Sequence, residues 1–459
     1  MSLSHAKDDE RNRAREVRRV ILATLIGTTL EWYDFFLYAT CAVLIFGPLF
    51  FPSGNSVAGQ LGAMATFTVG FLARPLGGII AGHFGDRVGR KRMLSLTLTI
   101  MGLSTVGVGL VPTYAQAGVW APALLVTMRV IQGLAMGGEW GGAVSMATEH
   151  APPNRKTLYA AAPAVGPAIG LVLANLVLIG LTSATGASFG TWGWRIAFLG
   201  SILLVAVGVL ARRQLAESPL FEESVAKAPE SVPVLEVLRS HGGTLLKTIF
   251  VAGIPAITTY MLNVYMLGYG TKTDGYDHSS LLWLSTAINA LSAVLQVYAA
   301  RLSDRFGMWP VLMVGAVSSA VTAFLLFPLF DSRNLALAAL ASIIVISPAC
   351  VSLAVVPAFL TEQFPPKIRY TGISMAYQIG SIVGGGFAPL IADAILAGTG
   401  KPWLISGYMA GANLVALVCL LLLRKKPAWQ QQAEEQTAGA VPTQADGRDL
   451  VGDVPASGS

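Results

Sequence analysis

Apolar residues in this chain gather into runs of about twenty, separated by short polar segments. The runs lie at 20–48, 58–84, 93–111, 120–148, 157–182, 194–211, 245–268, 279–300, 310–329, 335–361, 370–396 and 402–423. A helix of about twenty apolar residues crosses the hydrocarbon core of a bilayer. The pattern therefore predicts an all-α integral membrane protein with twelve transmembrane helices.

Composition and charge support this interpretation. The chain is 54% hydrophobic and 12% charged, with a mean hydropathy of +0.62, whereas a soluble domain carries about twice that charged fraction. Lys and Arg lie mostly in alternate loops, and only Arg195, Lys272, Arg333 and Lys401 fall in the loops between. Because cytoplasmic loops collect Lys and Arg, both termini are predicted to be cytoplasmic. The net charge of +6 then reflects topology and does not indicate a nucleic-acid partner.

A long charged connection divides the chain into two sets of six helices. We expect a cytoplasmic N-terminal tail (1–19), a six-helix bundle (20–211), a cytoplasmic linker (212–244), a second six-helix bundle (245–424) and a disordered cytoplasmic tail (425–459). The phrase Asp-Arg-x-Gly follows the second and the eighth run, as Asp86-Arg87-x-Gly89 and Asp304-Arg305-x-Gly307. Two pseudo-symmetric bundles predict a solute site between them, near the membrane midplane.

Charged residues inside the apolar runs are the first candidates for function. Glu31 and Asp34 in the first run and Arg129 in the fourth all fall near the middle of a ~30 Å hydrocarbon core. Since burying a charge in lipid is costly, such residues are usually functional. We expect Glu31 or Asp34 to exchange a proton in a site shared with Arg129; the alternative is a structural salt bridge. Arg74 and Glu139 have matching depths and form a second candidate pair, with an ion pair for helix packing as the simpler interpretation.

Neutral polar side chains dominate the second half and suit a hydroxylated or carboxylated solute. Arg129 is a possible partner for a carboxylate. The candidates for solute binding are Tyr33, Arg129, Gln132, Tyr260, Asn263, Asn289, Tyr377 and Gln378. Each of them alone could instead make a structural hydrogen bond between helices.

Several other functions have no support in the sequence. The five histidines fall at the ends of runs or in loops, and Cys41, Cys350 and Cys419 have no ligand spacing, so no metal site is expected. The chain contains no Gly-x-x-x-x-Gly-Lys phosphate loop. We therefore expect no cofactor and no enzymatic activity, a proton gradient as the driving force, and a monomer.

The loop Gly82-x-x-x-Asp86-Arg87-x-Gly89-Arg90-Lys91 resembles the signature loop of the major facilitator superfamily. The phrases GTTLEWYDFFLYA, FLARPLGG, RVIQGLAMGGEWGG, WGWRIAF and LAESPLFEE are similar to those of bacterial metabolite:proton symporters, and RYTGISMAYQIGSIVGGGFAP is similar to that of shikimate-transporter-like members. This resemblance implies the major facilitator fold and proton-coupled uptake of a small organic acid across the bacterial inner membrane. It also implies that the signature loop, with Asp304 and Arg305 in the second copy, gates the inner side, and that the Arg-x-x-Gln-Gly element at Arg129 serves proton coupling.

Two alternatives remain open at this point. The phrase VGPAIG (165–170) partly resembles a motif of antiporters, which would fit proton-coupled export. A membrane sensor that keeps a transporter fold without transporting is the other alternative.

Overall fold

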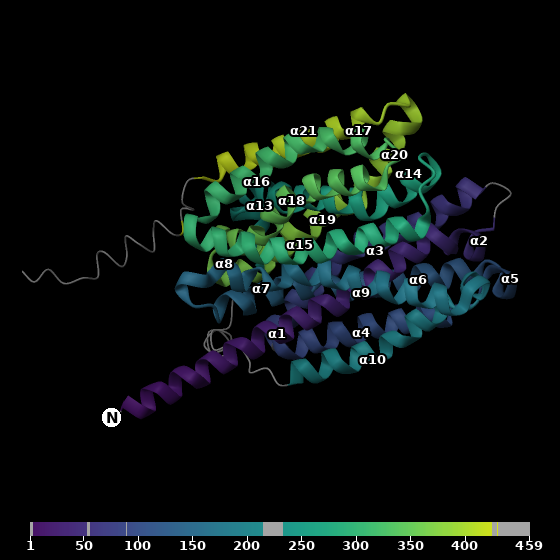
Figure 1. Cartoon of the computed structure of the whole chain (residues 1–459). Coiled ribbons are helices and arrows are strands. Elements are labelled where there is room, and N and C mark those ends of the chain that lie inside the picture. Colours follow the sequence, from purple (N-terminus) through teal and green to yellow (C-terminus); the bar gives the residue numbers. More distant parts are fainter. Residues whose placement is uncertain (1–2, 53–55, 89, 214–232, 425–428, 430–459) are drawn as a thin grey trace, which may run out of the picture. The chain divides into compact units, whose positions relative to one another are not determined.

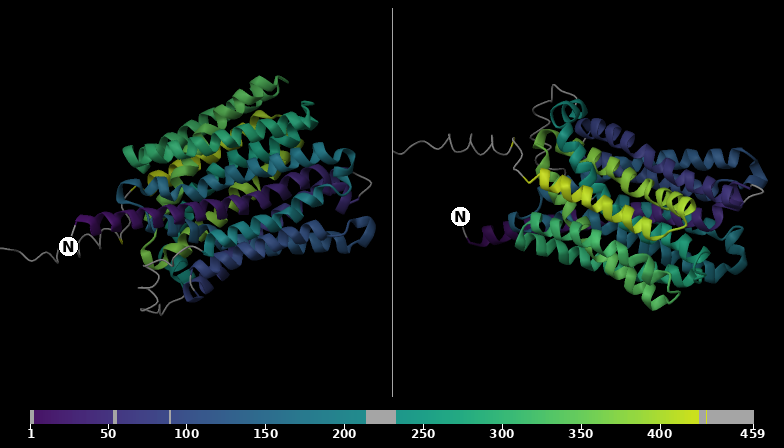
Figure 2. Two further views of the ribbon diagram at one scale, coloured as in Figure 1. Left: turned by 60° about the horizontal axis from the view of Figure 1, so that its bottom comes forward. Right: turned by 90° about the horizontal axis from the view of Figure 1, so that it is seen from above.

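The computed structural model describes residues 3–52, 56–88, 90–213, 233–424 and residue 429. Within these residues every regular element is a helix, which confirms the all-α prediction. Contacts make the chain up to Arg424 one compact unit. The unit that ends at Arg424 consists of long helices that run side by side (Figures 1 and 2).

The described residues of the first half form ten α-helices and three short helices of other types. They are α1 (Leu3–Cys41), the π-helix η1 (Ala42–Phe46), α2 (Gly47–Phe50), α3 (Ser56–Val88), α4 (Arg90–Leu110), α5 (Tyr114–Ala117), α6 (Trp120–Gly137), α7 (Glu139–Glu149), η2 (Pro153–Arg155), α8 (Lys156–Ala160), α9 (Ala162–Thr185), η3 (Gly186–Gly190) and α10 (Trp194–Arg213). Within this half, α1 packs on α9, α3 on α6, and α4 on α10.

The second half repeats this plan. Its helices are α12 (Pro233–Ser240), α13 (Gly242–Tyr260), the π-helix η4 (Met261–Tyr265), α14 (Met266–Lys272), α15 (His278–Phe306), α16 (Met308–Thr322), η5 (Ala323–Leu325), α17 (Leu326–Phe330), α18 (Leu335–Gln363), η6 (Pro366–Ile368), α19 (Arg369–Ser381), the π-helix η7 (Ile382–Gly386), α20 (Ala388–Thr399) and α21 (Trp403–Leu422). The first span of each half carries a π-helical turn, η1 and η4, and such turns are frequent at functional sites.

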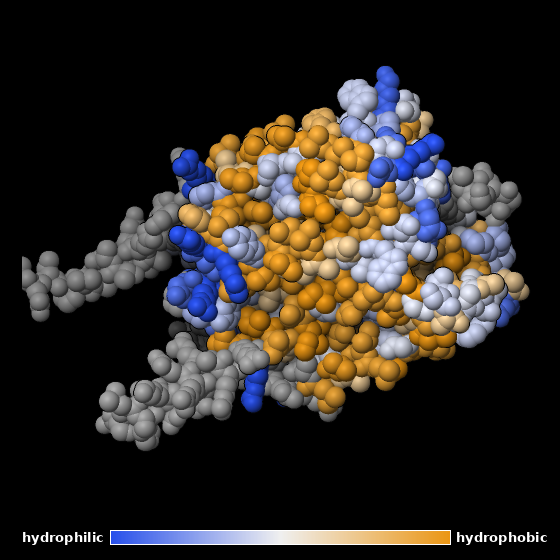
Figure 3. Space-filling model, viewed as in Figure 1, coloured by the Kyte–Doolittle hydropathy of each residue, from blue (hydrophilic) through white to orange (hydrophobic). Residues whose placement is uncertain are grey.

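Eleven helices of the described chain are long and apolar enough to cross a membrane. The sixth predicted span corresponds to α10, whose apolar stretch Trp194–Leu210 is shorter than the others. Large apolar side chains such as Trp120 and Leu203 (each 71% exposed) point outward. Apolar residues cover the middle of the face seen in Figure 3, and hydrophilic residues gather at its two ends, as expected of a protein that crosses a bilayer.

Close helix contacts depend on glycine. A Cβ atom at Gly77 would collide with the backbone of Leu134, so this position lets α3 approach α6. Gly70 lies about two helical turns earlier on α3. A Cβ atom there would lie 2.9 Å from Nη2 of Arg129. In a bilayer the hydrophobic effect does not drive helices together. Close packing at small residues supplies the attraction between them instead.

Candidate functional site

A cavity of about 60 Å³ lies between the two halves. Space of this size accommodates roughly four to six water molecules. Its wall combines aromatic rings with hydroxyl and amide groups and contains no ionisable acid or base except tyrosine. The lining residues are Trp32, Phe36, Trp140, Ala164, Pro167, Ala168, Ala252, Ala256, Thr259, Tyr260, Asn289, Ser292, Gln296, Leu353, Val356 and Tyr377.

Contacts between α6, α7 and α19 adjoin the cavity. The rings of Trp140 and Tyr377 stack with centroids 3.5 Å apart and planes 4° from parallel. Next to this stack, Tyr370 Oη donates a hydrogen bond to the carbonyl oxygen of Gly138 at 2.5 Å, and Gln378 Nε2 donates to that of Gly137 at 3.0 Å. These contacts join the first half to the second.

The two halves also meet at other residues of the wall. The ring of Tyr260 lies 6.3 Å from that of Phe36 and 5.6 Å from that of Phe71, measured between centroids. Farther along, Asn175 Nδ2 donates to Ser285 Oγ at 3.3 Å. These contacts and the wall residues place the cavity at the interface of the two halves.

Arg74 lies directly behind the cavity wall. Its guanidinium carbon is 4.2 Å from the ring centroid of Phe71, 4.4 Å from that of Phe35 and 5.4 Å from that of Trp32. Tyr260, Glu31 and Tyr377 act on it electrostatically. Since Trp32, Tyr260 and Tyr377 line the cavity, the charges of Arg74 and Glu31 are one layer of side chains away from a solute. The pairing of Arg74 with Glu139, which is also fully buried, stays a prediction.

Asp34 belongs to a different group of side chains, which extends toward α4 and α10. Ser201 Oγ donates to Asp34 Oδ1 at 2.7 Å, and the Thr105 hydroxyl is a second hydrogen-bond partner of this carboxylate. Gln132 Nε2 donates to Thr105 Oγ1 at 2.7 Å, and Arg129 Nη1 donates to Gln132 Oε1 at 2.8 Å. Asp34 and Arg129 are thus the two ends of a hydrogen-bonded chain and do not touch each other.

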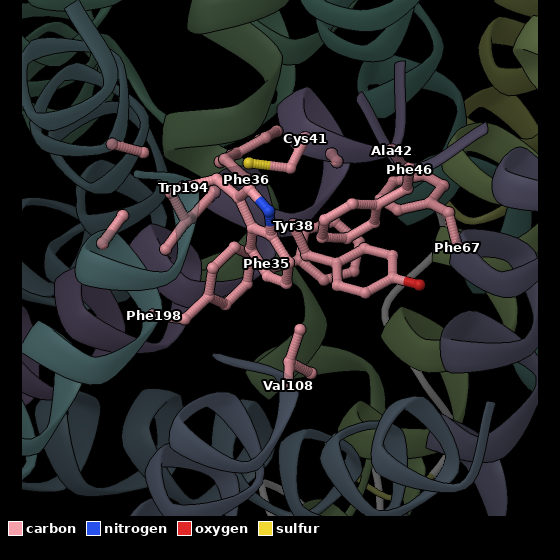
Figure 4. Close-up of a cluster of buried hydrophobic side chains, with 14 of the residues drawn as sticks. Phe35, Phe36, Tyr38, Cys41, Ala42, Phe46, Phe67, Val108, Trp194 and Phe198 are labelled. Atoms are coloured by element: carbon pink, nitrogen blue, oxygen red, sulfur yellow. The ribbon is translucent and has the colours of Figure 1, made fainter. Parts of the chain in front are cut away.

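Aromatic rings surround Arg129. Its guanidinium carbon lies 4.0 Å from the ring centroid of Tyr38, 5.2 Å from that of Phe35 and 5.7 Å from that of Phe67. Figure 4 shows these three rings in a buried cluster to which α1, η1, α3, α4 and α10 contribute. Ring faces attract a desolvated cation, so they offset part of the cost of burying this charge.

The remaining predicted solute-binding residues are divided between the cavity and structural positions. Tyr260, Asn289 and Tyr377 line the cavity. Asn263 accepts hydrogen bonds from Asn289 Nδ2 at 2.6 Å and Ser285 Oγ at 2.8 Å, so it supports the wall. Tyr33 Oη donates to the carbonyl oxygen of Ala197 at 3.4 Å on α10.

Some residues of the wall were not among the predicted solute-binding residues, such as Trp32, Phe36, Trp140, Thr259 and Ser292. Both tryptophans directly follow buried acids, Glu31 and Glu139. Their position directly after a buried acid was the available signal. If the acid lies near the solute site, the next residue on the helix also lies close to it. Thr259 and Ser292 carry no comparable signal.

The second copy of the repeated phrase joins the two halves. Asp304 accepts hydrogen bonds from the backbone N–H groups of Thr157 at 2.8 Å and Leu158 at 3.0 Å, at the start of α8. Arg305 stacks on the ring of Phe306. Gly89 and the side chains of the other signature-loop residues, Gly82, Asp86, Arg87, Arg90 and Lys91, lie outside the described residues.

Comparison with known proteins gives a consistent result. The family model described as Major Facilitator Superfamily matches residues 24–349 and 272–455. The shikimate transporter of Escherichia coli K12 is 39% identical over 413 residues, which cover 89% of this chain and 94% of that protein. An inner membrane metabolite transport protein of the same strain is 38% identical over 412 residues, covering 87% and 93%. A putative proline/betaine transporter of Staphylococcus aureus (strain COL) is 30% identical over 422 residues, covering 90% of each chain.

Among solved structures, the proton:xylose symporter bound to 6-bromo-6-deoxy-D-glucose superposes with a TM-score of 0.73. It is 17% identical in sequence, and the match covers 90% of this chain and 97% of that one. This likeness establishes the arrangement of two six-helix bundles.

Proposed function

Because the chain belongs to the Major Facilitator Superfamily, we propose that it takes up a small organic acid together with protons. It is a multi-pass membrane transporter for a small molecule and not an enzyme, like the relatives to which it is similar. The solute, the direction of transport and the coupling ion are the parts of this function that we propose.

The central cavity is the observation that carries this proposal. Its two tryptophans and Phe36 offer flat apolar surfaces, while Thr259, Asn289 and Tyr260 offer hydrogen-bonding groups. A compact ring that bears hydroxyl groups matches such a wall. Arg74 behind the wall supplies the positive charge that attracts a carboxylate. The relative named a shikimate transporter supports the same class of solute.

The proton gradient is the proposed driving force, and the buried acids of the first half are the proposed carriers. Asp34 can hold a proton while its hydrogen bonds to Ser201 and Thr105 persist, because a carboxyl group both donates and accepts. Glu31 acts on Arg74 beside the cavity and is the second candidate. An anionic solute that interacts with Arg74 weakens the attraction between Arg74 and Glu31, and this raises the proton affinity of Glu31. By linkage, protonation of Glu31 must then tighten solute binding by the same factor.

Localisation in a bacterial inner membrane with both termini in the cytoplasm completes the proposal. The Lys and Arg asymmetry of the loops supports this orientation. A reporter fused after Arg424 that is active only in the periplasm would overturn the orientation.

Transport by purified protein in liposomes tests the function. Labelled shikimate, quinate, aromatic acids, dicarboxylates and betaines are supplied outside vesicles with an inward proton gradient. We expect uphill uptake of one hydroxylated acid, and its loss when a protonophore collapses the gradient. Net efflux under the same gradient would establish export, and failure of any solute to show counterflow would favour a sensor.

A further inference from the structure

We propose that the guanidinium groups of Arg74 and Arg129 form a binding site for a small monovalent anion such as a halide. A second cavity, of about 10 Å³, lies where α3 faces α6. Its volume corresponds to roughly one water-sized particle. It is lined by Phe35, Gly70, Arg74, Met101, Arg129, Gln132, Gly133 and Met136.

The polar groups on this wall are donors. Both arginines are 1% exposed, and within the described part of the chain Nε and Nη2 of each have no hydrogen-bond partner. Gln132 engages its amide oxygen with Arg129 Nη1 and its amide nitrogen with Thr105. A water molecule has two hydrogens to donate, whereas an anion only accepts. Four unpartnered donor nitrogens therefore favour an anion over water.

The balance of charge leads to the same occupant. Arg74 and Arg129 are close enough to act on each other electrostatically. Glu31 acts on Arg74, but the described residues that act on Arg129 are Tyr38, Arg74 and Tyr260, none of them a carboxylate. Asp34 reaches Arg129 only through two neutral side chains. Because an uncompensated buried charge is costly, a small anion between the guanidinium groups supplies the missing negative charge.

This site is separate from the solute cavity but adjoins it. Tyr260 lines the solute cavity and acts on both arginines. A bound anion thus lies behind the tyrosine, where it adjusts the charge that the solute meets. The inference does not depend on the identity of the transported solute or on the direction of transport.

Halide-dependent stability of the purified full-length protein tests the inference. Sodium gluconate is replaced stepwise by sodium chloride or bromide at constant ionic strength, and the Tm is measured without any solute. We expect a saturable rise of about 2–5 °C, since a ligand that binds only the folded state stabilises it. Broadening of the ³⁵Cl NMR line gives an independent measure of binding. A Tm that is the same in gluconate and halide overturns the proposal.

Two pairs of variants separate the site from general salt effects. Gly70→Ala keeps every charge but places a methyl group against the Arg129 guanidinium, so we expect the halide effect to disappear; Gly180→Ala, where a Cβ meets open space, should retain it. Arg129→Gln should also abolish the effect. Its matched control is Arg195→Gln, because Arg195 donates to the carbonyl oxygens of Gly109 and Val111, away from the cavity. A halide effect that persists in Gly70→Ala overturns the proposal even if Arg129→Gln fails to fold.

A competition experiment distinguishes a free halide from the carboxylate of a solute. The halide titration is repeated with a saturating organic acid that the transport assay has identified. A halide affinity that keeps falling as the acid concentration is raised further shows that the carboxylate takes the same guanidinium pair, whereas a decrease that levels off shows coupling between two separate sites. An unchanged affinity assigns the pair to free halide alone.

Discussion

The two halves of the molecule place their buried polar residues in opposite ways. Among the described residues of the first half, five charged side chains are at most 5% exposed: Glu31, Asp34, Arg74, Arg129 and Glu139. The buried polar residues of the described second half are neutral, among them Asn263, Asn289, Ser292, Gln296 and Gln378. Since charge in a membrane interior is costly and usually functional, the difference indicates a division of labour. We propose that the first half handles ions and that the second contributes most of the hydrogen-bonding groups that recognise solute.

Among the described residues, two tyrosines stand between the cavity and the buried charge of Arg74. Tyr260 and Tyr377 belong to the second half and line the cavity, and both interact electrostatically with Arg74 in the first half. These two tyrosines are therefore the connection between solute recognition and the buried charges.

The largest expected effect comes from removing the charge of Asp34. Asp34→Asn keeps an oxygen for the Ser201 hydrogen bond but cannot exchange a proton. We expect accumulation against a gradient to fall to background while solute exchange persists, because the variant imitates the protonated state. Uphill uptake and counterflow in liposomes measure the two activities separately.

Glu31→Gln is the companion variant. If Glu31 carries the proton, this variant loses accumulation and Asp34→Asn keeps it. Uphill accumulation by both variants would mean that the division of labour is wrong and that the two acids are structural.

A neutral residue of the second half should affect affinity and not coupling. Asn289 lines the cavity and donates to Asn263 Oδ1 at 2.6 Å and to the carbonyl oxygen of Ser285 at 2.8 Å. We expect Asn289→Ala to raise KM about tenfold, which corresponds to the loss of ~1.4 kcal/mol of hydrogen bonding. The ratio of protons to solute should not change.

The matched control is Asn413→Ala. Asn413 is also a buried asparagine of the second half, but it donates to Met409 on its own helix and does not line the cavity. Its KM should stay near that of the parent. A changed proton ratio in Asn289→Ala would assign part of the coupling to the second half.

The sequence predicted the membrane helices and which side chains are buried, because a charge such as Asp34 in an apolar run is visible without a structure. It could not predict partners. Arg129 and Asp34 were expected to share a site directly, yet Gln132 and Thr105 lie between them. Thr105 comes from α4, and only tertiary packing reveals this contact. Likewise, Arg74 was interpreted as a packing residue, since nothing in its sequence neighbourhood indicates that Tyr260 and Tyr377 of the other half face it.

A smaller effect is expected at the contact through which the second half holds the first. Asp304→Asn weakens the two charge-assisted hydrogen bonds at the start of α8, at a cost of about 1 kcal/mol. The fraction of molecules in which the two halves are separated at this contact should then rise roughly fivefold. The alkylation rate of a cysteine introduced at Ser374, which is buried on α19 against Gly141 of α7, measures the opening.

Asp277→Asn serves as the control, because Asp277 caps α15 through Ser280 within the second half alone. It should leave the alkylation rate unchanged. Equal rates in all three proteins would show that Asp304 does not hold the halves together.

The smallest effect is expected at Asp331, an exposed acid of the second half that follows α17. Partial burial raises the pKa of this carboxyl above its ordinary value, and the hydrogen bond from Tyr269 at 3.0 Å opposes the shift. The folded protein therefore binds this proton more tightly than the unfolded chain, so the associated stability is present at low pH and is lost as the pH rises through the raised pKa. Asp331→Asn should raise the Tm by about 1 °C at pH 8, since exposure screens the interaction, and the gain should vanish near pH 4. A gain in Tm that is independent of pH would rule out this titration. If Asp331→Asn instead lost proton coupling in the transport assay, the second half would contain a functional acid, and the contrast between the halves would not hold.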